Sequence, residues 1–435
     1  MKSYELIADG EQIVKELAAR MNAGKIGLQD AEQRIVGFLN WVGDLMVQEV
    51  VAGVEEPTQA NRIMVDGEVA VFDQVRNLRF INRFGETVVR PRRCYKFVDQ
   101  RGSFAPLDAK LGIEGCFGFS PLMTMLICLL GADESYERSA TKLEALLGFA
   151  VSSTAVQRTT EKTGERIPDD PTELIDADER GQRCPLMVVE VDGTTSPQIS
   201  PQPGVTGRES LRAETCWKEC NLVVIEKRDA DNEITDRWTG ARYGPRMDFE
   251  PYAAQAGMQM GFMAAEQTLF IADGAHHNWE LAATHFPGSV QILDYYHAAE
   301  HLGKFCQLLP GSQRTPQLRK WEKLLYQGEA LQLIHELKGA VWKLADTDDG
   351  WKHINYFENN KERMDYGRYR ACGWPMGSGS VEGQCKFVVG RRFKGNGMRW
   401  RPHDNECVLR TRLAVLNGDL KRYFQPRSEV WNEAA

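Results

Sequence analysis

The sequence has no hydrophobic run long enough to cross a bilayer. Its most apolar stretch, 119–130, is shorter than the roughly 20 residues that a spanning helix needs. The first residues, Met1 to Glu5, also lack the basic-then-apolar order of a secretory signal peptide. Both absences predict a cytoplasmic protein with no membrane partner. In that compartment we expect the ten cysteines to be mostly reduced.

Closely spaced cysteine pairs, which many structural zinc sites use, are nearly absent as well. Only Cys216 and Cys220 lie close together, and no second pair follows at the spacing of zinc ligands. Internal repeats and low-complexity tracts are not evident either. We therefore expect ordinary thiols and, for a chain of 435 residues, roughly two or three globular domains.

Negative charge outnumbers positive charge overall, but the positive charge is concentrated in two segments. The net charge is −8, which as an average argues against a nucleic-acid partner. Residues 386–427, however, contain 11 Lys or Arg against 3 Asp or Glu, and residues 76–101 contain 8 against 2. Phosphate is neutralised locally, because salt screens charges beyond about 8–10 Å. The two basic islands are therefore compatible with DNA binding, although such runs are also usual on solvated surfaces.

The N-terminal region combines helix with a small β unit. Apolar residues recur at helical spacing within 3–54. They include Leu28, Ala31, Ile35, Phe38, Leu39, Val42, Leu45, Met46 and Val50. We interpret this stripe as facing the protein core, with a dimer contact as the alternative. Short β-branched runs at 63–65, 69–71 and 87–89 predict strands, with Asp66-Gly67 as a hairpin turn.

Residues 111–166 contain the elements of a helix-turn-helix. A helix that ends at Gly148 is followed by a second helix with a serine cap after Val151. The second helix of such a motif can enter the major groove, so its polar residues Gln157, Arg158 and Lys162 are candidate DNA contacts. Two helices joined by a turn are also common in any α-rich protein.

After an acidic stretch at 167–179, which we interpret as a linker, the pattern becomes α/β. Apolar strands are expected at 186–191, 221–226, 268–272 and 290–293, and three of them are followed directly by Asp192, Asp273 or Asp294. Residues 297–370 are then predicted to be largely helical. A Gly-Ser-Gly-Ser segment finally opens a helix that carries Glu382.

Aspartates at the carboxyl ends of adjacent strands repel one another unless a cation lies between them. Such oxygen ligands suit Mg²⁺ or Mn²⁺, and two ions can activate a hydroxyl and stabilise the leaving oxygen of a phosphodiester. Gly193 and Gly274, which follow the first two aspartates, would let the chain turn sharply. Each feature also has a plainer interpretation: an Asp-Gly pair often ends a strand, and Glu382 would favour its helix dipole.

Taken in order, several phrases are more specific than any single acid. They are Val-Asp192-Gly-Thr, Ala-Asp273-Gly-Ala, Asp294-Tyr-Tyr-His297-Ala-Ala-Glu-His, Met-Gly-Ser-Gly-Ser-Val-Glu382 and Arg392-Phe-Lys-Gly-Asn-Gly-Met-Arg-Trp400. In these phrases the chain resembles the ISKra group of bacterial insertion-sequence transposases and, more widely, the Mutator-like DDE enzymes. The resemblance covers roughly residues 115–425.

The resemblance implies a DNA transposase with an α/β RNase H-like catalytic core. Its catalytic triad falls on Asp192, Asp273 and Glu382, which would hold two Mg²⁺ or Mn²⁺ ions. Asp294 and His297 match an Asp/Cys-x-x-His motif that supports the active site instead of ligating both metals. The implied partners are the terminal inverted repeats of the transposon and its target DNA, and the implied assembly is a homo-oligomer.

These features predict five segments in chain order. They are an N-terminal helical and small β region (1–110), a helix-turn-helix-like DNA-binding region (111–166), a first part of the RNase H-like core (183–300), an α-helical insertion (301–370), and a second part of the core (371–425). In the last segment Arg392, Lys394 and Arg399 would bind phosphates. Trp400 would stack on an unpaired base or, alternatively, serve as a hydrophobic anchor.

The chain departs from the family pattern in two places, and three alternative interpretations of its motifs stay open. Relatives often carry a small cysteine motif near 90–106, where this chain has only Cys94, so we predict no zinc there. His276 and His277 are also unusual, and could disturb metal geometry or face solvent. His297 and His301 could form a metal pair. The chain could also be a catalytically inactive DNA-binding protein derived from a transposase, or a glycosidase with paired acids, which needs no metal.

Overall fold

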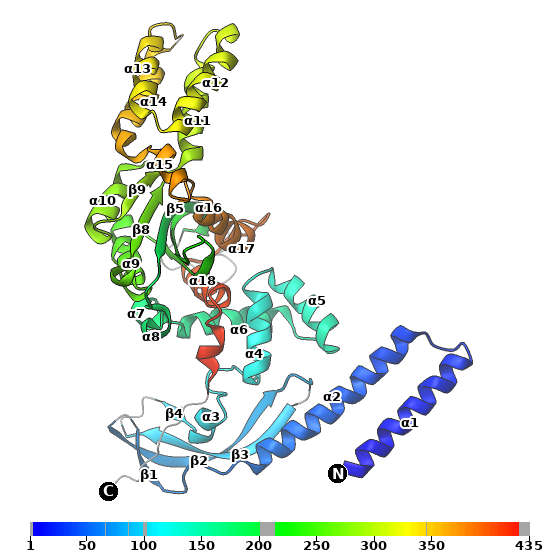
Figure 1. The fold of residues 1–435 in the computed structure, drawn as a ribbon. Helices are drawn as coiled ribbons and strands as arrows, with labels where there is room; N and C mark the ends of the chain where they lie inside the picture. The colour runs from blue at the N-terminus through cyan, green and yellow to red at the C-terminus, as the bar shows by residue number, and fades with distance from the viewer. Residues whose placement is uncertain are drawn as a thin grey trace. The chain divides into compact units, whose positions relative to one another are not determined.

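The computed structural model describes residues 3–65, 67–85, 87–98, 102–200, 214–344 and 346–425 (Figure 1). The chain forms two compact units: unit 1 contains residues 1–167 and 414–435, and unit 2 contains residues 168–413. The division after Ile167 falls within the acidic stretch that we interpreted as a linker. This stretch is more ordered than expected, because it forms helices α7 (Pro171–Leu174) and α8 (Ala177–Arg180). The expected segment 371–425 is divided between the two units.

Unit 1 begins with helices α1 (Ser3–Asn22) and α2 (Leu28–Gly53), followed by a four-stranded antiparallel sheet. Its strands are β1 (Arg62–Val65), β2 (Glu68–Ile81), β3 (Thr87–Phe97) and β4 (Ser103–Phe104). The predicted hairpin is confirmed, because Val65 pairs with Glu68 and Gly67 has a φ of 82°. Asp66, the other predicted turn residue, lies outside the described residues.

Five of the nine residues of the predicted apolar stripe on α2 are exposed, whereas Ala31 is buried and Phe38, Val42 and Leu45 are half-buried. The exposed fractions are 64% for Leu28, 40% for Ile35, 57% for Leu39, 61% for Met46 and 68% for Val50. Among the described helices, α2 is the one that is long and apolar enough to cross a membrane, judged by length and composition alone. The expectation that this stripe faces the core is therefore wrong for its five exposed residues. The expectation that no segment is long and apolar enough to cross a membrane is also corrected.

Three helices of unit 1 share a hydrophobic core that includes Met123, Ile127 and Leu143. They are α4 (Pro121–Gly131), α5 (Tyr136–Leu147) and α6 (Ser153–Arg166), and they follow the short helix α3 (Pro106–Lys110). The predicted boundaries are confirmed: Gly148 ends α5 with a φ of 81°, and the hydroxyl of Ser152 accepts a hydrogen bond from an amide in the first turn of α6. The 3-10 helix η5 (Leu420–Phe424) is the last described element of this unit.

Unit 2 is an α/β unit built on a five-stranded sheet with the order β7-β6-β5-β8-β9. The strands are β5 (Leu186–Ile199), β6 (Thr215–Arg228), β7 (Ile234–Tyr243), β8 (Gln267–Ala272) and β9 (Val290–Leu293). Strands β5, β6 and β7 are antiparallel neighbours, whereas β8 and β9 run parallel to β5. Four of these strands were predicted from the sequence, and β7 was not.

The helices expected between 297 and 370 are present (Figure 1). They are α11 (Tyr295–Gln307), α12 (Gly311–Gln327), α13 (Ala330–Val341), α14 (Thr347–Asn360), η3 (Lys361–Arg363) and α15 (Tyr366–Ala371). Before them lie α9 (Arg246–Gln259), η2 (Phe262–Ala264) and α10 (His276–His285). After them, α16 (Gly379–Gln384), the π-helix η4 (Cys385–Gly390) and α17 (Arg391–Phe393) follow without a break, and α18 (Pro402–Leu416) comes last.

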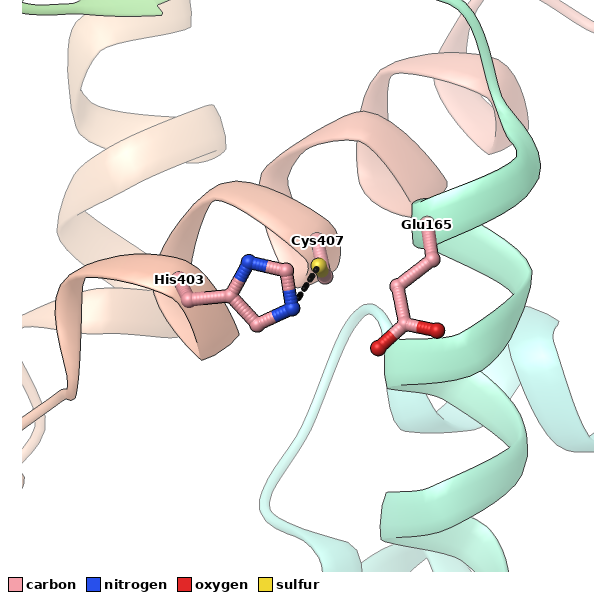
Figure 2. A group of neighbouring side chains, drawn as sticks. All are labelled: Glu165, His403 and Cys407. Carbon is pink, nitrogen blue, oxygen red and sulfur yellow. Dashed lines mark hydrogen bonds between the residues drawn. The ribbon is translucent and has the colours of Figure 1, made fainter.

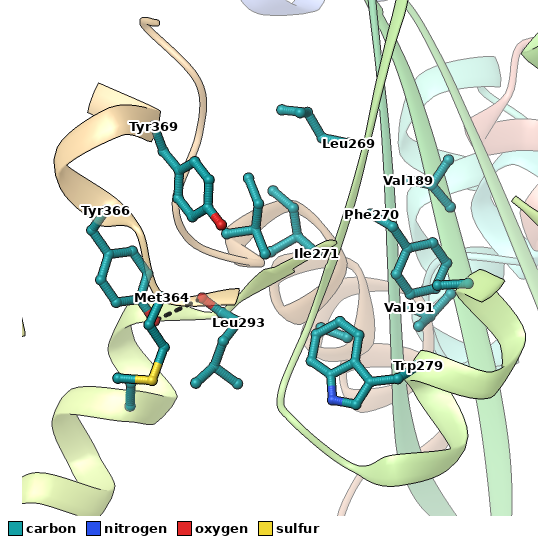
Figure 3. Close-up of a cluster of buried hydrophobic side chains, with 14 of the residues drawn as sticks. Val189, Val191, Leu269, Phe270, Ile271, Trp279, Leu293, Met364, Tyr366 and Tyr369 are labelled. Atoms are coloured by element: carbon teal, nitrogen blue, oxygen red, sulfur yellow. Dashed lines mark hydrogen bonds between the residues drawn. The ribbon is translucent and has the colours of Figure 1, made fainter. Parts of the chain in front are cut away.

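The main core of unit 2 surrounds the parallel strands β5, β8 and β9. Side chains on both faces of these strands are buried, which explains why the strands read as nearly continuous apolar runs. Phe270 and Ile271 of β8 are fully buried, and burying each such side chain contributes about 1.5–3 kcal/mol to the stability of the fold. The hydroxyl of Tyr366 donates to the carbonyl of Leu293 at 2.9 Å, which ties the helical segment to the end of β9 (Figure 3).

Candidate active site at one edge of the unit 2 sheet

Asp192, Asp273 and Asp294 lie in one row across three adjacent parallel strands. Paired residues of β5 and β8 differ by 81 positions, and 273 − 192 = 81. Paired residues of β8 and β9 differ by 21 positions, and 294 − 273 = 21. Neighbouring strands lie about 4.8 Å apart, and residues in register point to the same face. The structure therefore gathers three aspartates that are distant in the sequence.

Asp192 does not end its strand. β5 continues to Ile199 because β6 pairs with it along its whole length, and Gly193 takes part in this pairing opposite Asn221. The sharp turn that we predicted at Gly193 is therefore wrong. At the second aspartate the prediction is confirmed, since Asp273 follows the last residue of β8 and Gly274 has a φ of 96°.

The carboxylate of Asp192 is held from two sides. The Gly193 amide donates to its Oδ1 at 2.7 Å, and the Cys385 thiol lies 3.5 Å from its Oδ2. Burial raises the pKa of Asp192, and the negative charge of Asp273 raises this pKa further. The carboxylate of Asp192 therefore lies in a poorly solvated environment, with the carboxylate of Asp273 nearby.

Asp273 is fixed through one of its two carboxylate oxygens. Its Oδ1 accepts hydrogen bonds from the Ala275 amide at 3.0 Å and from Asn278 Nδ2 at 2.8 Å. The carbonyl oxygen of Asn278 accepts in turn from Arg246, whose guanidinium is half-buried. Tyr356 donates to the backbone carbonyl of Asp273 at 2.9 Å. Among the described residues, Oδ2 of Asp273 has no hydrogen-bond partner and is available to a ligand.

Asp294 organises the neighbouring segments. It caps α11 by accepting from the His297 amide at 2.8 Å, and it accepts from the amide and the hydroxyl of Ser378. Burial raises the pKa of Asp294, but the hydrogen bonds from His297 and Ser378 outweigh it and lower this pKa to about 2. The Asp294 carboxylate, whose Oδ1 lies 3.3 Å from Nδ1 of His297, raises the pKa of this imidazole to about 9, with further contributions from Asp273 and Asp192. A positively charged imidazole therefore stands beside the row of aspartates.

Glu382 lies near this row but is not joined to it. The side chain is exposed on α16, and its Oε1 is 2.6 Å from Lys386 Nζ. Within unit 2, no three His, Cys, Asp or Glu among the described residues bring ligand atoms within 4.8 Å of one another. Glu382 precedes Cys385 by three residues, so the two share one side of the helix. Since Cys385 contacts Asp192, the structure brings the helix, but not the Glu382 carboxylate, to the aspartates.

Four polar residues at this edge were missed by the sequence analysis. They are Glu190, Glu226, Arg246 and Asn278. Burial raises the pKa of Glu190 to about 8. A sequence signal for Glu190 did exist, because an acid inside an apolar strand and two residues before Asp192 must share the face of that aspartate. The other three gave no signal, since their partners are brought together only by the tertiary fold.

Two of the predicted DNA contacts are buried. Arg392 is 1% exposed and lies over the ring of Trp400, which is itself 8% exposed and donates its indole N–H to the Phe393 carbonyl. The prediction that these two side chains bind DNA is corrected, because neither reaches the surface in this conformation. The structure favours the alternative in which Trp400 is a hydrophobic anchor. Lys394 and Arg399 are exposed, and Lys394 donates to the hydroxyl of Thr194 at 2.7 Å.

The candidate DNA contacts of unit 1 lie on α6. Arg158 is exposed, and the Lys162 ammonium lies 5.3 Å from the centre of the Phe117 ring. Gln157 donates to Glu161 at 3.0 Å, one turn further along the helix. The polar side of α6 therefore carries the three residues that we expected there. Their binding to DNA stays a prediction.

The histidines show no metal pair at the predicted positions. His301 lies 3.0 Å from His353, measured between their Nδ1 atoms, whereas His297 is paired with Asp294. His276 and His277 are both exposed, which favours the interpretation that they face solvent.

The cysteines also give unit 2 no complete metal centre. Among the described residues, none of the ten cysteines forms a disulfide. On α18, His403 and Cys407 lie one turn apart, with Nε2 of the imidazole 3.7 Å from the thiol (Figure 2). Two ligands are fewer than the four of a structural zinc site, so we assign no metal to this pair.

Comparison with protein-family models found no match, and no curated protein matches the chain significantly. The similarity to transposases therefore rests on the sequence motifs themselves.

Proposed function

We propose that this chain is a DDE-type DNA transposase that cleaves DNA and joins strands with the help of two divalent metal ions. The observation that carries the proposal is the row of aspartates at one edge of the sheet, with a helix bearing Glu382 beside it. A single aspartate after a strand has many explanations. Three aspartates in register, two of which form no salt bridge with any described residue, repel one another, and a bound cation would offset this repulsion.

The architecture of unit 2 supports an RNase H-like core as the finer description of its α/β fold. Three antiparallel strands are followed by two strands parallel to the first, and a helix-rich segment separates the last strand from the helix with Glu382. This arrangement is compatible with the α-helical insertion that the family resemblance implies. The first and second aspartates occupy adjacent strands, as a shared metal site would require.

The donor set fits Mg²⁺ or Mn²⁺. Carboxylate oxygens are the ligands that these ions prefer, and Asp273 keeps one oxygen without a hydrogen bond among the described residues. Asp192 and Asp273 would hold the metal ions, with Glu382 completing one site after leaving Lys386. When bound, such ions lower the pKa of an attacking water or hydroxyl and stabilise the leaving oxygen of a phosphodiester.

The surrounding residues orient these carboxylates. Asn278 holds Asp273 by its Oδ1, and the Gly193 amide holds Asp192, so each aspartate presents a fixed direction. His297 and Asp294 act as the supporting pair: the charged imidazole offsets part of the negative charge, and Asp294 anchors the loop before α16. None of these four roles requires contact with DNA.

We further propose that the partners are terminal inverted repeats and target DNA, bound by a cytoplasmic homo-oligomer. Arg158 and Lys162 on α6, together with Lys394 and Arg399 after the Glu382 helix, are the candidate phosphate contacts. The exposed apolar stripe on α2 supports an oligomer, because a soluble surface seldom keeps such a stripe uncovered.

The direct test is strand cleavage by the purified full chain on DNA from the two flanks of its gene, with Mg²⁺ or Mn²⁺. Asp192→Asn should reduce cleavage at least about 100-fold, the size of loss seen when a group that stabilises developing charge is removed. Asp348→Asn, at an exposed position on α14, should cleave like the parent. Equal cleavage by Asp192→Asn and the parent would refute the metal mechanism. DNA binding without any cleavage by the parent would instead support the inactive, DNA-binding alternative.

A further inference from the structure

The segment that leads into the Glu382 helix is held by three buried acidic side chains, which lie on or directly after three different strands. Glu190 lies on β5, Glu226 lies on β6, and Asp294 follows β9. Their exposed fractions are 1%, 0% and 2%. Each accepts hydrogen bonds from one residue of the four-residue segment 378–381, which directly precedes Glu382.

The contacts are specific and short. Glu190 Oε2 accepts from the backbone amide of Val381 at 2.8 Å. Glu226 Oε1 accepts from the hydroxyl of Ser380 at 2.6 Å and from Arg237 Nε at 2.9 Å, and its other oxygen pairs with Arg228. The remaining hydrogen bonds join Asp294 to Ser378, as described above.

Burying carboxylates is costly unless they are paired and hydrogen-bonded, and an apolar side chain of similar volume often stabilises a core equally well. Stability alone therefore gives little reason for Glu190 to be an acid, whereas Glu226 also neutralises Arg228 and Arg237. A carboxylate differs from an apolar side chain in being able to specify where a particular N–H or O–H group must lie. The arrangement specifies the position of the first turn of α16.

The helix and β5 are matched in direction and spacing. Val381 contacts Glu190, and Cys385 contacts Asp192, so four helical residues span the same interval as two residues of the strand. Four residues of helix rise about 6 Å, and two residues of strand rise about 6.6 Å. Glu382 lies between the two contact points in sequence. The hydrogen bond at Val381 therefore controls how far the Glu382 side chain must reach toward the aspartates.

We propose that Glu190 and Glu226 are positioning residues, which hold the Glu382 helix in register with Asp192. This inference rests on the proposed function, because it assigns Glu382 a role that depends on its distance from the aspartates. It adds two residues of β5 and β6 to the machinery of the reaction. Both act through α16 and need not touch DNA or metal.

The first test uses two variants at one position in the full-length protein. Glu190→Gln keeps an acceptor for the Val381 amide, whereas Glu190→Leu keeps the volume but removes the acceptor. Amide hydrogen exchange in the segment 378–386, measured without metal, should be about tenfold faster or more in Glu190→Leu and near the parent value in Glu190→Gln. Exchange in β8 (267–272) should stay unchanged in both, which shows that the sheet remains folded.

Ser380→Ala tests Glu226 without disturbing its two arginine partners. It removes only the hydroxyl donor, and we expect a smaller, about threefold, increase in exchange in the same segment. Glu362→Gln and Glu362→Leu, at an exposed position outside the site, are the matched controls and should leave exchange in 378–386 unchanged. Equal exchange in Glu190→Leu and the parent would overturn the assignment of Glu190.

The second measurement follows DNA cleavage at saturating DNA. Glu190→Leu should lower kcat about tenfold or more with KM for DNA unchanged, and Glu190→Gln should recover most of the loss. A parallel fall in both variants would show that the charge, and not the hydrogen bond, matters, and would overturn the positioning role. If the parent itself cleaves no DNA, the proposed function fails, while the exchange experiment still decides whether the carboxylates hold the helix.

Discussion

At the scale of single residues, Asn278 is the connection between Asp273 and its surroundings. It is 3% exposed, and its amide donates to Asp273 while its carbonyl oxygen accepts from Arg246. Replacing Asn278 by leucine keeps the volume but leaves a carboxylate and a guanidinium without their common partner. We expect Asn278→Leu to lower the free energy of unfolding by about 1–3 kcal/mol.

Urea unfolding of the full chain measures this loss. The neighbouring His277 is exposed, so His277→Leu should change the free energy of unfolding by less than about 0.5 kcal/mol. If Asn278→Leu is as stable as the His277 control, the hydrogen bonds to Asp273 and Arg246 contribute nothing net to folding.

The same residues show what the sequence could predict. Asp192 and Asp273 were identifiable because an aspartate that follows an apolar strand is expected at the carboxyl end of an α/β sheet, where ligands bind. Asn278 and Arg246 were not, since an asparagine at a helix start and an arginine after a proline are ordinary there. Arg392 was misjudged for a related reason: its charge predicts exposure, but the indole of Trp400 covers it. Only the folded chain shows which polar groups find partners inside.

At the scale of elements, strand length decides the geometry of the site. The apolar run 186–191 predicted a strand that stops at Asp192, yet β5 extends to Ile199. The extension has mixed polarity, and it is a strand because β6 pairs with it, which a local pattern cannot reveal. Strand β7 was missed for the same reason, since its consecutive polar residues at 235–237 hide the alternation. The longer strand places Asp192 where β8 ends, instead of at a turn.

Helices α11 and α14 meet through a histidine pair that predicts a pH-dependent stability. His301 stacks on Tyr356 with ring centres 3.7 Å apart and lies beside His353. Burial, followed by the charge of His353, lowers the pKa of His301 to about 4, and burial also lowers that of His353. Below a pH of about 6.5 the unfolded chain therefore binds more protons at His301 than the folded chain does. Stability should fall as the pH drops from about 6.5 toward 4.

Thermal unfolding at pH values of about 7 and 5 tests this sign. His301→Gln removes the titrating group, so its Tm should fall less between the two pH values than the Tm of the parent. His335→Gln, on the exposed side of α13, should behave like the parent. A variant of His301 that loses as much Tm as the parent would show that carboxylates, and not this histidine pair, set the acid limit.

At the scale of the whole molecule, the two units differ in how well the sequence predicted them. In unit 2, the apolar runs of the sequence predicted four of the five strands. The acids that follow these runs predicted the edge of the sheet at which the aspartates meet. In unit 1, the helices and their caps were predicted, but the environment of α2 was not. An apolar stripe has the same sequence pattern whether a core, a second copy or a membrane covers it. Periodicity therefore predicts the stripe but not its occupant.

The stripe itself favours a second copy of the chain. Taking 100° per residue, Leu28, Ile35, Leu39, Met46 and Val50 fall within about 60° of one another, because their spacings alternate between seven and four. No charged residue occurs from Ile35 to Gly43, so two such helices can approach without repulsion. A narrow seam of this kind suits helix pairing, whereas a helix that crosses a membrane is apolar all round.

Replacing Leu39 and Met46 by glutamate should therefore halve the mass measured by light scattering, or shift the dissociation constant at least about 100-fold. Two apolar contacts of this size contribute about 3–6 kcal/mol when fully buried, which is more than the 2.7 kcal/mol of a 100-fold change. Gln33→Glu, also exposed on α2 but off the stripe, controls for added charge. Sedimentation with anionic and neutral vesicles tests the rival occupant. A monomeric parent that binds vesicles through Leu39 and Met46 would overturn the helix-pairing interpretation, because the same stripe cannot be covered by lipid and by a second copy at once.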